Sequence, residues 1–137
     1  LYHVPDVPRA LAEFHRVLTP GGRCYAATFS HGNMREFNDA VERILGRRVS
    51  NSAAHFGLES GLPPMQGAFA QVEVIKYPDS MVVTEVEPLI DYVKSTRMHR
   101  LVSDDKIEAL RNFFAHEIVA HQGFRISKDA GIFVAQK

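Results

Sequence analysis

Residues 1–22 read LYHVPDVPRALAEFHRVLTPGG, and this stretch decides how the rest of the chain is interpreted. Leu1 and Tyr2 are typical of the end of a strand, and a short turn follows them. Asp6 is a suitable N-cap for a helix with Pro8 in its first turn, where the missing N–H costs little. The apolar residues after it recur at helical spacing, which predicts a helix with one buried side. They are Leu11, Phe14, Val17 and Leu18.

A Pro-Gly-Gly sequence ends this helix, and an apolar run over residues 23–29 follows at once. A short apolar run between turn signals is typical of a strand buried on both faces. After a polar loop, Asn33 is a suitable N-cap for a second helix, with Glu36 placed for a capping box. This helix is expected to end at Gly46. Its apolar face comprises Met34, Phe37, Val41, Ile44 and Leu45.

The next segment, residues 47–70, scatters Ser, Asn, Gly, Pro and Gln among isolated apolar residues. This composition predicts a long loop with a short helix near residues 59–65. Residues 71–77 and 81–86 alternate well enough to predict two strands around a turn at 77–80.

The carboxy-terminal third is expected to contain two helices and a hairpin. Pro88 opens the short helix, and the longer one is capped by Ser103 and ends near Gly123. Residues 124–127 and 132–135 then form the strands of a final hairpin whose turn includes a glycine.

The composition is that of a soluble globular protein, with 137 residues, 45% apolar and 23% charged, and a formal net charge of zero. Because phosphate binding needs concentrated positive charge, the even balance argues against nucleic acid or an anionic membrane as the main partner. No apolar run approaches the length of a membrane span, and no signal-peptide pattern stands at the start. A single cysteine, Cys24, is typical of a cytoplasmic protein.

Residues 1–30 resemble, in order and spacing, the second half of the class I S-adenosylmethionine (SAM)-dependent methyltransferases, especially the small-molecule, type 11-like branch. In that family a Leu-Tyr-His-Val-Pro-Asp type of segment ends a strand, and a helix ending in Arg-Val-Leu and a Pro-Gly-Gly turn follow. The resemblance implies an α/β, partial Rossmann-like fold with the family's fourth and fifth helices and fifth to seventh strands. It also implies that residues 47–70 are an insertion over the substrate pocket, where FGLESG is similar to a Phe-Thr-Leu-Glu-Asn-Gly pattern.

The same resemblance implies SAM as the cofactor and a small molecule as the methyl acceptor. The glycine-rich turn that cradles the cofactor is absent, since Gly21-Gly22 precedes a strand instead of opening a helix. The chain starts with Leu inside an expected strand, so we interpret residues 1–137 as a single domain that is a fragment, or a truncated gene product, without the cofactor-binding half. Alone, it is not expected to bind SAM with normal affinity.

Ligands in open α/β sheets lie beyond the carboxyl ends of the strands. The resemblance therefore implies that Leu1, Tyr2 and His3 lie beside the methionine end of the cofactor. His3 is the candidate catalytic residue, because it could hydrogen-bond the cofactor carboxylate or the acceptor, or take a proton. The alternative is that Tyr2 and His3 only finish a strand and cap the turn. The candidates on the substrate side are His31, His55, Phe56 and Glu59. The alternative is that they are only exposed loop residues.

Two other groups of residues are weaker candidates. Arg97, His99 and Arg100 could attract an anionic substrate or form a solvated face. His116 and His121 are five residues apart, whereas two zinc-binding histidines on one helix face need a spacing of four, so no metal site is predicted.

A second hypothesis belongs to another class of function, a catalytically silent folding or assembly module. If the neighbouring strand is lost, residues 23–29 become an apolar edge with unpaired backbone groups. Such a surface is expected to be covered by a second copy, by an exchanged segment or by the missing amino-terminal half. The sequence therefore predicts a homo-oligomer with either this strand or the helix at residues 7–18 in the contact.

Overall fold

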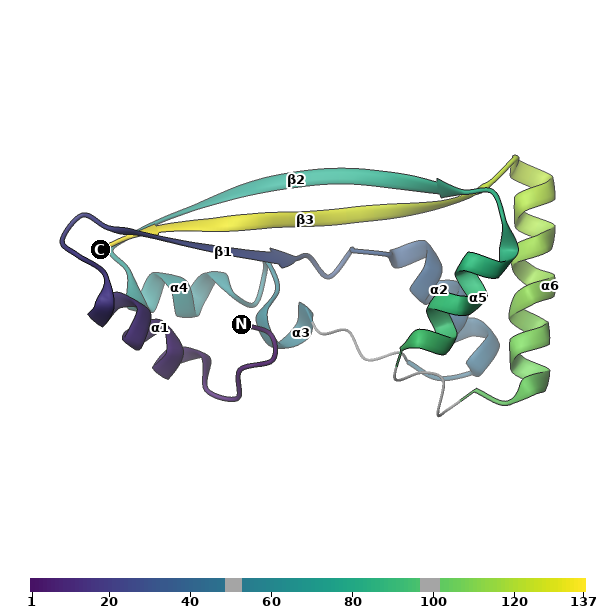
Figure 1. The fold of residues 1–137 in the computed structure, drawn as a ribbon, viewed down its shortest axis with the longest axis horizontal. Helices are drawn as coiled ribbons and strands as arrows, with labels where there is room; N and C mark the ends of the chain where they lie inside the picture. The colour runs from purple at the N-terminus through teal and green to yellow at the C-terminus, as the bar shows by residue number, and fades with distance from the viewer. Residues whose placement is uncertain (49–52, 97–101) are drawn as a thin grey trace. The chain divides into compact units, whose positions relative to one another are not determined.

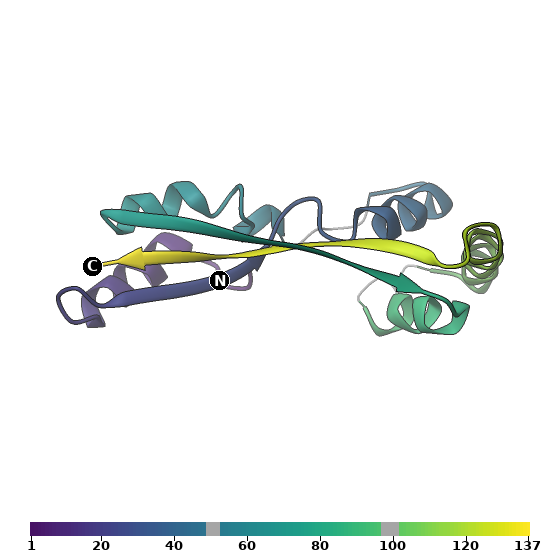
Figure 2. The same cartoon turned by 90° about the horizontal axis from the view of Figure 1, so that it is seen from above.

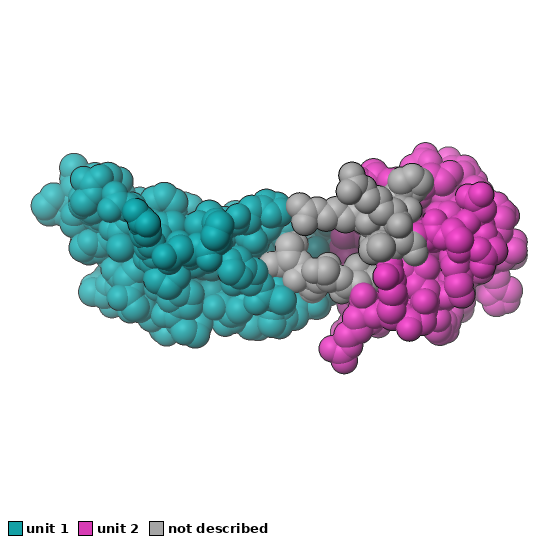
Figure 3. Space-filling view, turned by 90° about the horizontal axis from the view of Figure 1, so that it is seen from below, with its two compact units in different colours: residues 1–33, 51–79, 128–137 teal, residues 34–50, 80–127 magenta. Residues whose placement is uncertain are grey.

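The structure is a computed structural model that describes residues 1–48, 53–96 and 102–137. The chain forms two compact units, each with its own core (Figure 3). Unit 1 comprises residues 1–33, 51–79 and 128–137, and unit 2 comprises residues 34–50 and 80–127.

Six helices and three strands are described in the chain outside residues 49–52 and 97–101 (Figure 1). In chain order they are α1 (Val7–Val17), β1 (Arg23–Phe29), α2 (Arg35–Leu45), α3 (Ala53–Phe56), α4 (Leu62–Ala68), β2 (Gln71–Val83), α5 (Val86–Ser95), α6 (Asp104–His121) and β3 (Phe124–Gln136).

The three strands form one sheet in the order β1-β3-β2. β1 and β3 are antiparallel, with a register that runs from Arg23 opposite Gln136 to Phe29 opposite Ala130. β2 and β3 also run in opposite directions (Figure 2). The α/β class is confirmed at this level, as helices with a small antiparallel sheet.

Both predicted hairpins are wrong. β2 continues through the expected turn at residues 77–80, and β3 continues through residues 128–131. Pro78 is tolerated because β2 is an edge strand of the described sheet, where a missing N–H need not break a ladder. Gly131 is needed for close approach, since a Cβ there would lie 2.7 Å from the carbonyl oxygen of Ile75.

The predicted burial of the first strand on both faces is also wrong. Along β1, exposed residues alternate with half-buried or buried ones. Cys24 and Ala26 face the core of unit 1, whereas Tyr25 is 60% exposed. Alternation of this kind is the pattern of a sheet covered on one face only.

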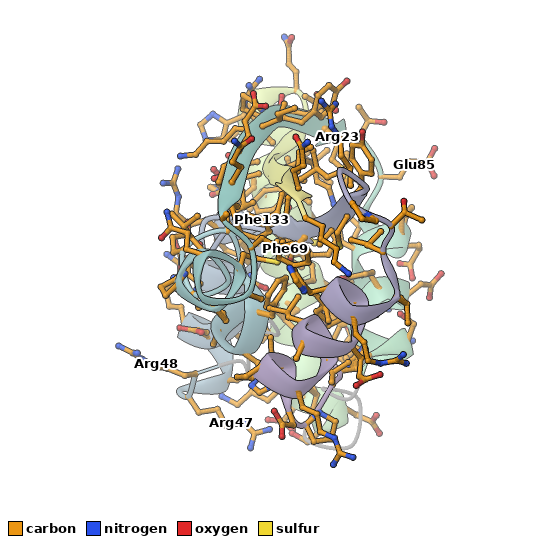
Figure 4. The ribbon with its side chains drawn as sticks, turned by 90° about the vertical axis from the view of Figure 1, so that its left-hand side faces the viewer. Arg23, Arg47, Arg48, Phe69, Glu85 and Phe133 are labelled. Carbon is orange, nitrogen blue, oxygen red and sulfur yellow. The ribbon has the colours of Figure 1, made fainter. Side chains whose placement is uncertain are left out.

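The core of unit 1 lies between that covered face and the helices α1, α3 and α4. α1 and α4 contact each other, and α3 contacts β1. Figure 4, which looks along the sheet, shows Phe69 and Phe133 pointing into this core. The buried members are Val7, Leu11, Phe56, Leu58, Met65, Phe69, Phe133 and Ala135.

The core of unit 2 is built by α2, α5, α6 and the first residues of β3. The rings of Phe37 and Phe114 stack with their centroids 5.8 Å apart, and Phe124 meets Phe114 edge-on at 5.0 Å. The buried members are Phe37, Ala40, Val41, Leu89, Ile90, Val93, Ile107, Leu110, Phe114, Phe124 and Ile126. The apolar stripe predicted for α2 supplies Phe37 and Val41 to this set, and Met34, Ile44 and Leu45 pack against it.

The predicted helix caps have different outcomes. Asp6 caps α1, as predicted, because its carboxylate accepts the N–H of Arg9 at 2.9 Å. The capping box at α2 is wrong: the helix begins after Met34, which has φ +58°, and no side chain caps it. Asn33 Oδ1 accepts the N–H of Asp129 instead, at 3.1 Å. Ser103 is the N-cap residue of α6 but its side chain makes no capping hydrogen bond.

The insertion at residues 47–70 contains more helix than predicted. The expected short helix near residues 59–65 is present as α4, which starts three residues later at Leu62, and α3 precedes it. Residues 49–52 of the insertion lie outside the described residues. The same holds for Arg97, His99 and Arg100, so their proposed attraction for anions stays a prediction.

Candidate functional site

The residues singled out from the sequence meet in unit 1, beyond the carboxyl end of β1. The chain starts beside this end, and α3 lies next to it (Figure 1). The ring centroid of Tyr2 is 6.5 Å from that of Phe29, the last residue of β1, and 4.5 Å from the His3 ring. Leu1 and Tyr2 also pack against the core of unit 1, whereas His3 is exposed. Of the three residues, only His3 is therefore exposed, and Leu1 and Tyr2 are half-buried.

His55 ties the insertion to the amino-terminal turn. It lies in α3, and its Nε2 is 2.8 Å from the carbonyl oxygen of Val4. Because a carbonyl can only accept, His55 Nε2–H is the donor, and Nδ1 of the neutral ring is left as an acceptor. The turn that carries His3 is itself closed by a hydrogen bond from Val4 N–H to the carbonyl of Leu1. These bonds hold His3 and His55 on the same rim.

Glu59 and His31 form the second contact across the rim. The N–H of His31 donates to Glu59 Oε2 at 3.1 Å, and the ring Nδ1 lies 3.9 Å from the same oxygen. Both side chains are about half exposed, at 52% and 50%. An exposed pair of this kind contributes little to stability. Its carboxylate and imidazole therefore remain accessible to a ligand.

Phe56 occupies a different position from the other candidates. Its ring is only 1% exposed and packs edge-on against Phe133, with centroids 5.7 Å apart. Its carbonyl accepts the hydroxyl of Thr28 at 2.6 Å, and the next segment is anchored where Leu58 N–H donates to the carbonyl of Phe29. Phe56 thus fastens the insertion to β1, and a direct contact with substrate stays a prediction.

The FGLESG segment needs a glycine at its end for reasons of space. A Cβ on Gly61 would lie 2.6 Å from the carbonyl oxygen of Gly57 and 3.0 Å from the Phe133 ring. The turn is also closed by Gly57 N–H donating to the hydroxyl of Ser60. This packing brings Glu59 to the rim while Phe56 stays in the core.

A partly buried polar pair near the rim, Ser30 and Asp129, was missed by sequence reasoning. Ser30 follows β1 directly and is 3% exposed. Its hydroxyl hydrogen-bonds Asp129 Oδ2 and accepts the N–H of Gly32, and its own N–H donates to the carbonyl of Asp129. The partners are 99 residues apart, so no local pattern could have indicated them. The pair fixes the course of the backbone that carries His31.

In unit 2, Glu36 forms a comparable link to β3. Its two carboxylate oxygens accept the N–H of Ser127 at 2.8 Å and the Ser127 hydroxyl at 2.7 Å. Burial raises the pKa of this carboxyl, but the bonds from Ser127 outweigh it and lower the pKa from 4.5 to about 2. The carboxylate is therefore already satisfied, which favours a structural role for Glu36.

Two cavities among the described residues contain no candidate site residue. One, of about 400 Å³, lies in unit 2 against α2 and α6. The other, of about 600 Å³, lies in unit 1 at the amino-terminal end of β1, lined by Arg23, Glu73 and Gln136 among others.

The described residues offer little sign of other kinds of site. In residues 1–48, 53–96 and 102–137, no three His, Cys, Asp or Glu side chains come together as they would around a metal ion. Burial raises the pKa of the Cys24 thiol, which is the environment of a small buried apolar residue. None of the helices in these ranges has the length and apolar character needed to cross a membrane.

A comparison with known protein families finds a match for the opening stretch of the chain. Residues 1–26 match the family model described as methyltransferase domain. The relatives are a 2-phytyl-1,4-naphtoquinone methyltransferase of Thermosynechococcus vestitus, 38% identical over 58 residues, and two malonyl-[acyl-carrier protein] O-methyltransferases. Those of Pectobacterium atrosepticum and Serratia marcescens are 30% identical over 80 residues and 40% over 47.

These alignments cover 42%, 57% and 34% of this chain, in that order, but only 26%, 32% and 18% of the relatives. The chain thus spans less than a third of the curated relatives that it matches. A solved structure, the phosphoethanolamine N-methyltransferase 2 of Haemonchus contortus with phosphomonomethylethanolamine and S-adenosylhomocysteine, is similar with a TM-score of 0.38. It is 16% identical, and the match covers 99% of this chain and 31% of that one.

The opening stretch is thus similar to a class of proteins, the methyltransferases. The resemblance of residues 1–30 to the SAM-dependent methyltransferases, a family within that class, is confirmed by these matches. SAM is the cofactor of that family.

Proposed function

We propose that these residues form the carboxy-terminal, acceptor-side part of a SAM-dependent methyltransferase that methylates a small molecule. The observation that carries the proposal is the family match over residues 1–26, which ends in β1, at whose carboxyl end the candidate residues gather. Four segments reach that rim: the amino-terminal turn, the end of β1, α3 and the FGLESG segment. Strand ends are where α/β enzymes hold their ligands.

His3 is the residue that we propose as general base or acceptor ligand. It is exposed, and its ring is positioned by contact with Tyr2 at 4.5 Å between centroids. Leu1 and Tyr2 would line the methionine end of SAM, while His31, His55 and Glu59 supply polar groups for the acceptor. Methyl transfer depends mostly on alignment of acceptor, methyl and sulfur, so these residues would act mainly by orienting the acceptor.

The chain alone is proposed to be inactive. Its sequence has no glycine-rich turn that opens a helix after a strand, since Gly21 and Gly22 lead from α1 into β1. The backbone approach that SAM requires would then come from residues beyond this sequence. We also propose a cytoplasmic location, which rests only on the single cysteine.

Calorimetric titration and a chimera test the proposal together. Titration of residues 1–137 with SAM should show no tight binding; stoichiometric micromolar binding would overturn the proposed inactivity. In the chimera, residues 1–137 replace the matching carboxy-terminal part of the Serratia marcescens relative. This chimera should bind SAM and transfer its methyl group, and His3→Ala should lower its kcat about 10²-fold or more if His3 is the base.

A matched control separates chemistry from folding. His15→Ala, on α1 in the same unit, should leave the activity of the chimera unchanged. A chimera that folds and binds SAM but retains full activity with His3→Ala would remove His3 from the site. A folded chimera that binds no SAM would contradict the family placement itself.

A second candidate function is the assembly module, and one observation favours it. β1 is an edge strand of the described sheet, and one face of that sheet in unit 1 bears exposed aromatic residues. A monomer seldom leaves such a surface uncovered. Under this alternative the chain has no catalytic role and functions by associating with another chain.

A further inference from the structure

The turn at residues 30–33, directly after β1, is held by hydrogen bonds on its backbone. The Ser30 N–H donates to the carbonyl of Asp129 at 2.9 Å, and the carbonyl of Ser30 accepts the N–H of Asn33 at 3.2 Å. The Gly32 N–H donates to the Ser30 hydroxyl oxygen at 3.0 Å. Three of the four N–H groups of the turn are thus bound by Ser30 or Asp129, which leaves the turn little freedom to change its course.

Asp129 gives the Ser30 hydroxyl its role in this turn. The hydroxyl donates its hydrogen to Asp129 Oδ2, since a carboxylate can only accept, and its oxygen is then left to accept the Gly32 N–H. The Asp129 N–H donates to Asn33 Oδ1 at 3.1 Å, at the other end of the turn. A Cβ added at Gly32 would lie 3.4 Å from Ser30 Oγ and 3.5 Å from Asp129 Oδ2. The middle of the turn therefore lies directly against this pair.

The fourth N–H of the turn, that of His31, faces the insertion. It donates to Glu59 Oε2 at 3.1 Å, and the His31 ring Nδ1 lies 3.9 Å from the same oxygen. Because half of the Glu59 side chain is exposed, packing alone holds its carboxylate poorly. The direction of the His31 N–H therefore decides where this carboxylate lies.

The backbone of the insertion is fixed separately, through the peptide group that precedes the turn. The carbonyl of Phe29 accepts the Leu58 N–H at 3.0 Å, and the N–H of the same peptide group, that of Ser30, donates to Asp129. The C=O and N–H of a trans peptide point in opposite directions, so this group is held between the insertion on one side and β3 on the other. Leu58 thus fixes the backbone next to Glu59, whereas Ser30 and Asp129 fix the turn that its carboxylate meets.

We propose that Ser30 and Asp129 are positioning residues of the acceptor side: they direct the His31 N–H so that it holds the Glu59 carboxylate at the rim. Ser30 is 3% exposed, so it acts through the turn and not by contact with the acceptor. The inference rests on the proposed function, in which His31 and Glu59 orient the acceptor. Since a misplacement of about 1 Å can cost roughly 10²-fold in rate, the place of the carboxylate matters more than the stability that the turn adds.

The experiment uses NMR spectroscopy of residues 1–137 at neutral pH and needs no methyl transfer. In the wild-type chain, Glu59→Gln removes the charge next to His31 and should shift the resonances of the His31 amide and ring. In Ser30→Ala the Gly32 N–H loses its acceptor, and its protection against hydrogen exchange should fall about tenfold. In the Ser30→Ala chain, Glu59→Gln should no longer shift the His31 resonances, because the contact is already lost.

A conservative variant separates the hydrogen bond from the rest of the side chain. Asp129→Asn keeps an oxygen that accepts the Ser30 hydroxyl, so the His31 resonances should still respond to Glu59→Gln. Asp129→Ala removes that oxygen and should abolish the response.

Ser127→Ala is the matched control for a general loss of stability. It removes a hydroxyl–carboxylate bond of the same kind, from Ser127 to Glu36 at 2.7 Å, within unit 2. It should lower the stability of the fold, but the response of the His31 resonances to Glu59→Gln should stay as in the wild type.

Three results would overturn the proposal. They are a wild-type chain in which His31 does not respond to Glu59→Gln, a response that persists in Ser30→Ala, and a response that Ser127→Ala abolishes equally. In the second case the pair only ends β1, and in the third the rim follows overall stability. The proposed function has a different readout, SAM binding and methyl transfer by the chimera, so the two proposals can fail separately.

Discussion

The two units bury their aromatic residues differently. In unit 2 the ring of Phe114 contacts the rings of Phe37 and Phe124 in the middle of three helices. In unit 1 Phe133 is buried beneath the sheet, while Tyr25 on the neighbouring strand is 60% exposed above it. The aromatic rings of unit 2 are thus enclosed in its core, whereas in unit 1 only one face of the sheet is covered. The family match and the candidate site residues both lie in the unit that is left open.

The largest expected effect compares the two cores directly. Phe37→Ala in unit 2 and Phe133→Ala in unit 1 each remove a ring with no exposed surface and leave a cavity. Each should lower the free energy of unfolding by about 3–5 kcal/mol. Urea denaturation followed by hydrogen exchange shows which amides lose protection in each variant.

If the units are independent, Phe37→Ala should release only amides of unit 2 and Phe133→Ala only those of unit 1. Val119→Ala is the control and should change the free energy by less than about 0.5 kcal/mol, because its side chain is 83% exposed. Loss of protection across the whole chain in both variants would show that the two cores unfold as one.

The next effect concerns two glycines of unit 1. Gly61→Ala forces a methyl group to 2.6 Å from the carbonyl oxygen of Gly57, whereas Gly67→Ala meets no atom within 4 Å. Gly61→Ala should cost about 1–3 kcal/mol through overpacking. Gly67 lies in α4, so its replacement should stabilise by about 0.5–1 kcal/mol. Thermal unfolding of both variants checks the signs of these two changes in stability. Equal changes in the two variants would contradict the packing described around FGLESG.

Acid unfolding tests Glu36 in unit 2. Its pKa is lowered to about 2 in the folded chain, so the carboxylate stabilises the fold above pH 4.5, and this contribution disappears as the pH falls toward 2. Glu36→Gln should therefore cost about 1 kcal/mol at pH 7. The difference from the wild type should shrink between pH 5 and pH 2, as judged by urea midpoints.

Glu13→Gln in unit 1 is the matched control. Among the residues that the structure describes, its carboxylate has an ion pair only with Arg16, and the two side chains are 58% and 68% exposed. An exposed pair of this kind is worth about 0–1 kcal/mol, and we expect the effect to lie at the low end. If the difference in urea midpoint between the wild type and Glu36→Gln stays constant down to pH 2, the role given to Ser127 is contradicted.

Much of the fold could be predicted from local sequence, because helices are stabilised by contacts close in the chain. The apolar spacing of α1 and α2 and the capping by Asp6 are local signals, and both helices were predicted from them. The strands of the sheet were harder to predict from the sequence. The Pro-Asp and Asp-Ala-Gly sequences of β2 and β3 are typical of turns, but pairing with distant strands kept both segments extended.

In the candidate site, too, local features could be predicted from the sequence and contacts between distant residues could not. A family resemblance pointed to residues 1–3 and to the insertion, and the structure brings His55 and Glu59 to the end of β1. Sequence reasoning could not find the Ser30–Asp129 pair, since a hydrogen bond over 99 residues leaves no local pattern. It also could not foresee that Phe56 is buried, because an aromatic residue in a polar loop has no mark of its burial.

The smallest predicted effect again compares the units, through the first residue of a helix in each. Asp6 caps α1 with a hydrogen bond to Arg9 N–H at 2.9 Å, whereas Ser103 precedes α6 without one. Asp6→Ala should therefore cost about 1 kcal/mol, and Ser103→Ala less than about 0.5 kcal/mol. Two acidic residues in the first turn of α6, Asp104 and Asp105, already favour its amino terminus through the helix dipole, and α1 has none. Thermal unfolding at low salt measures both, and a larger loss in Ser103→Ala would show that the hydroxyl, not the charge, holds the start of α6.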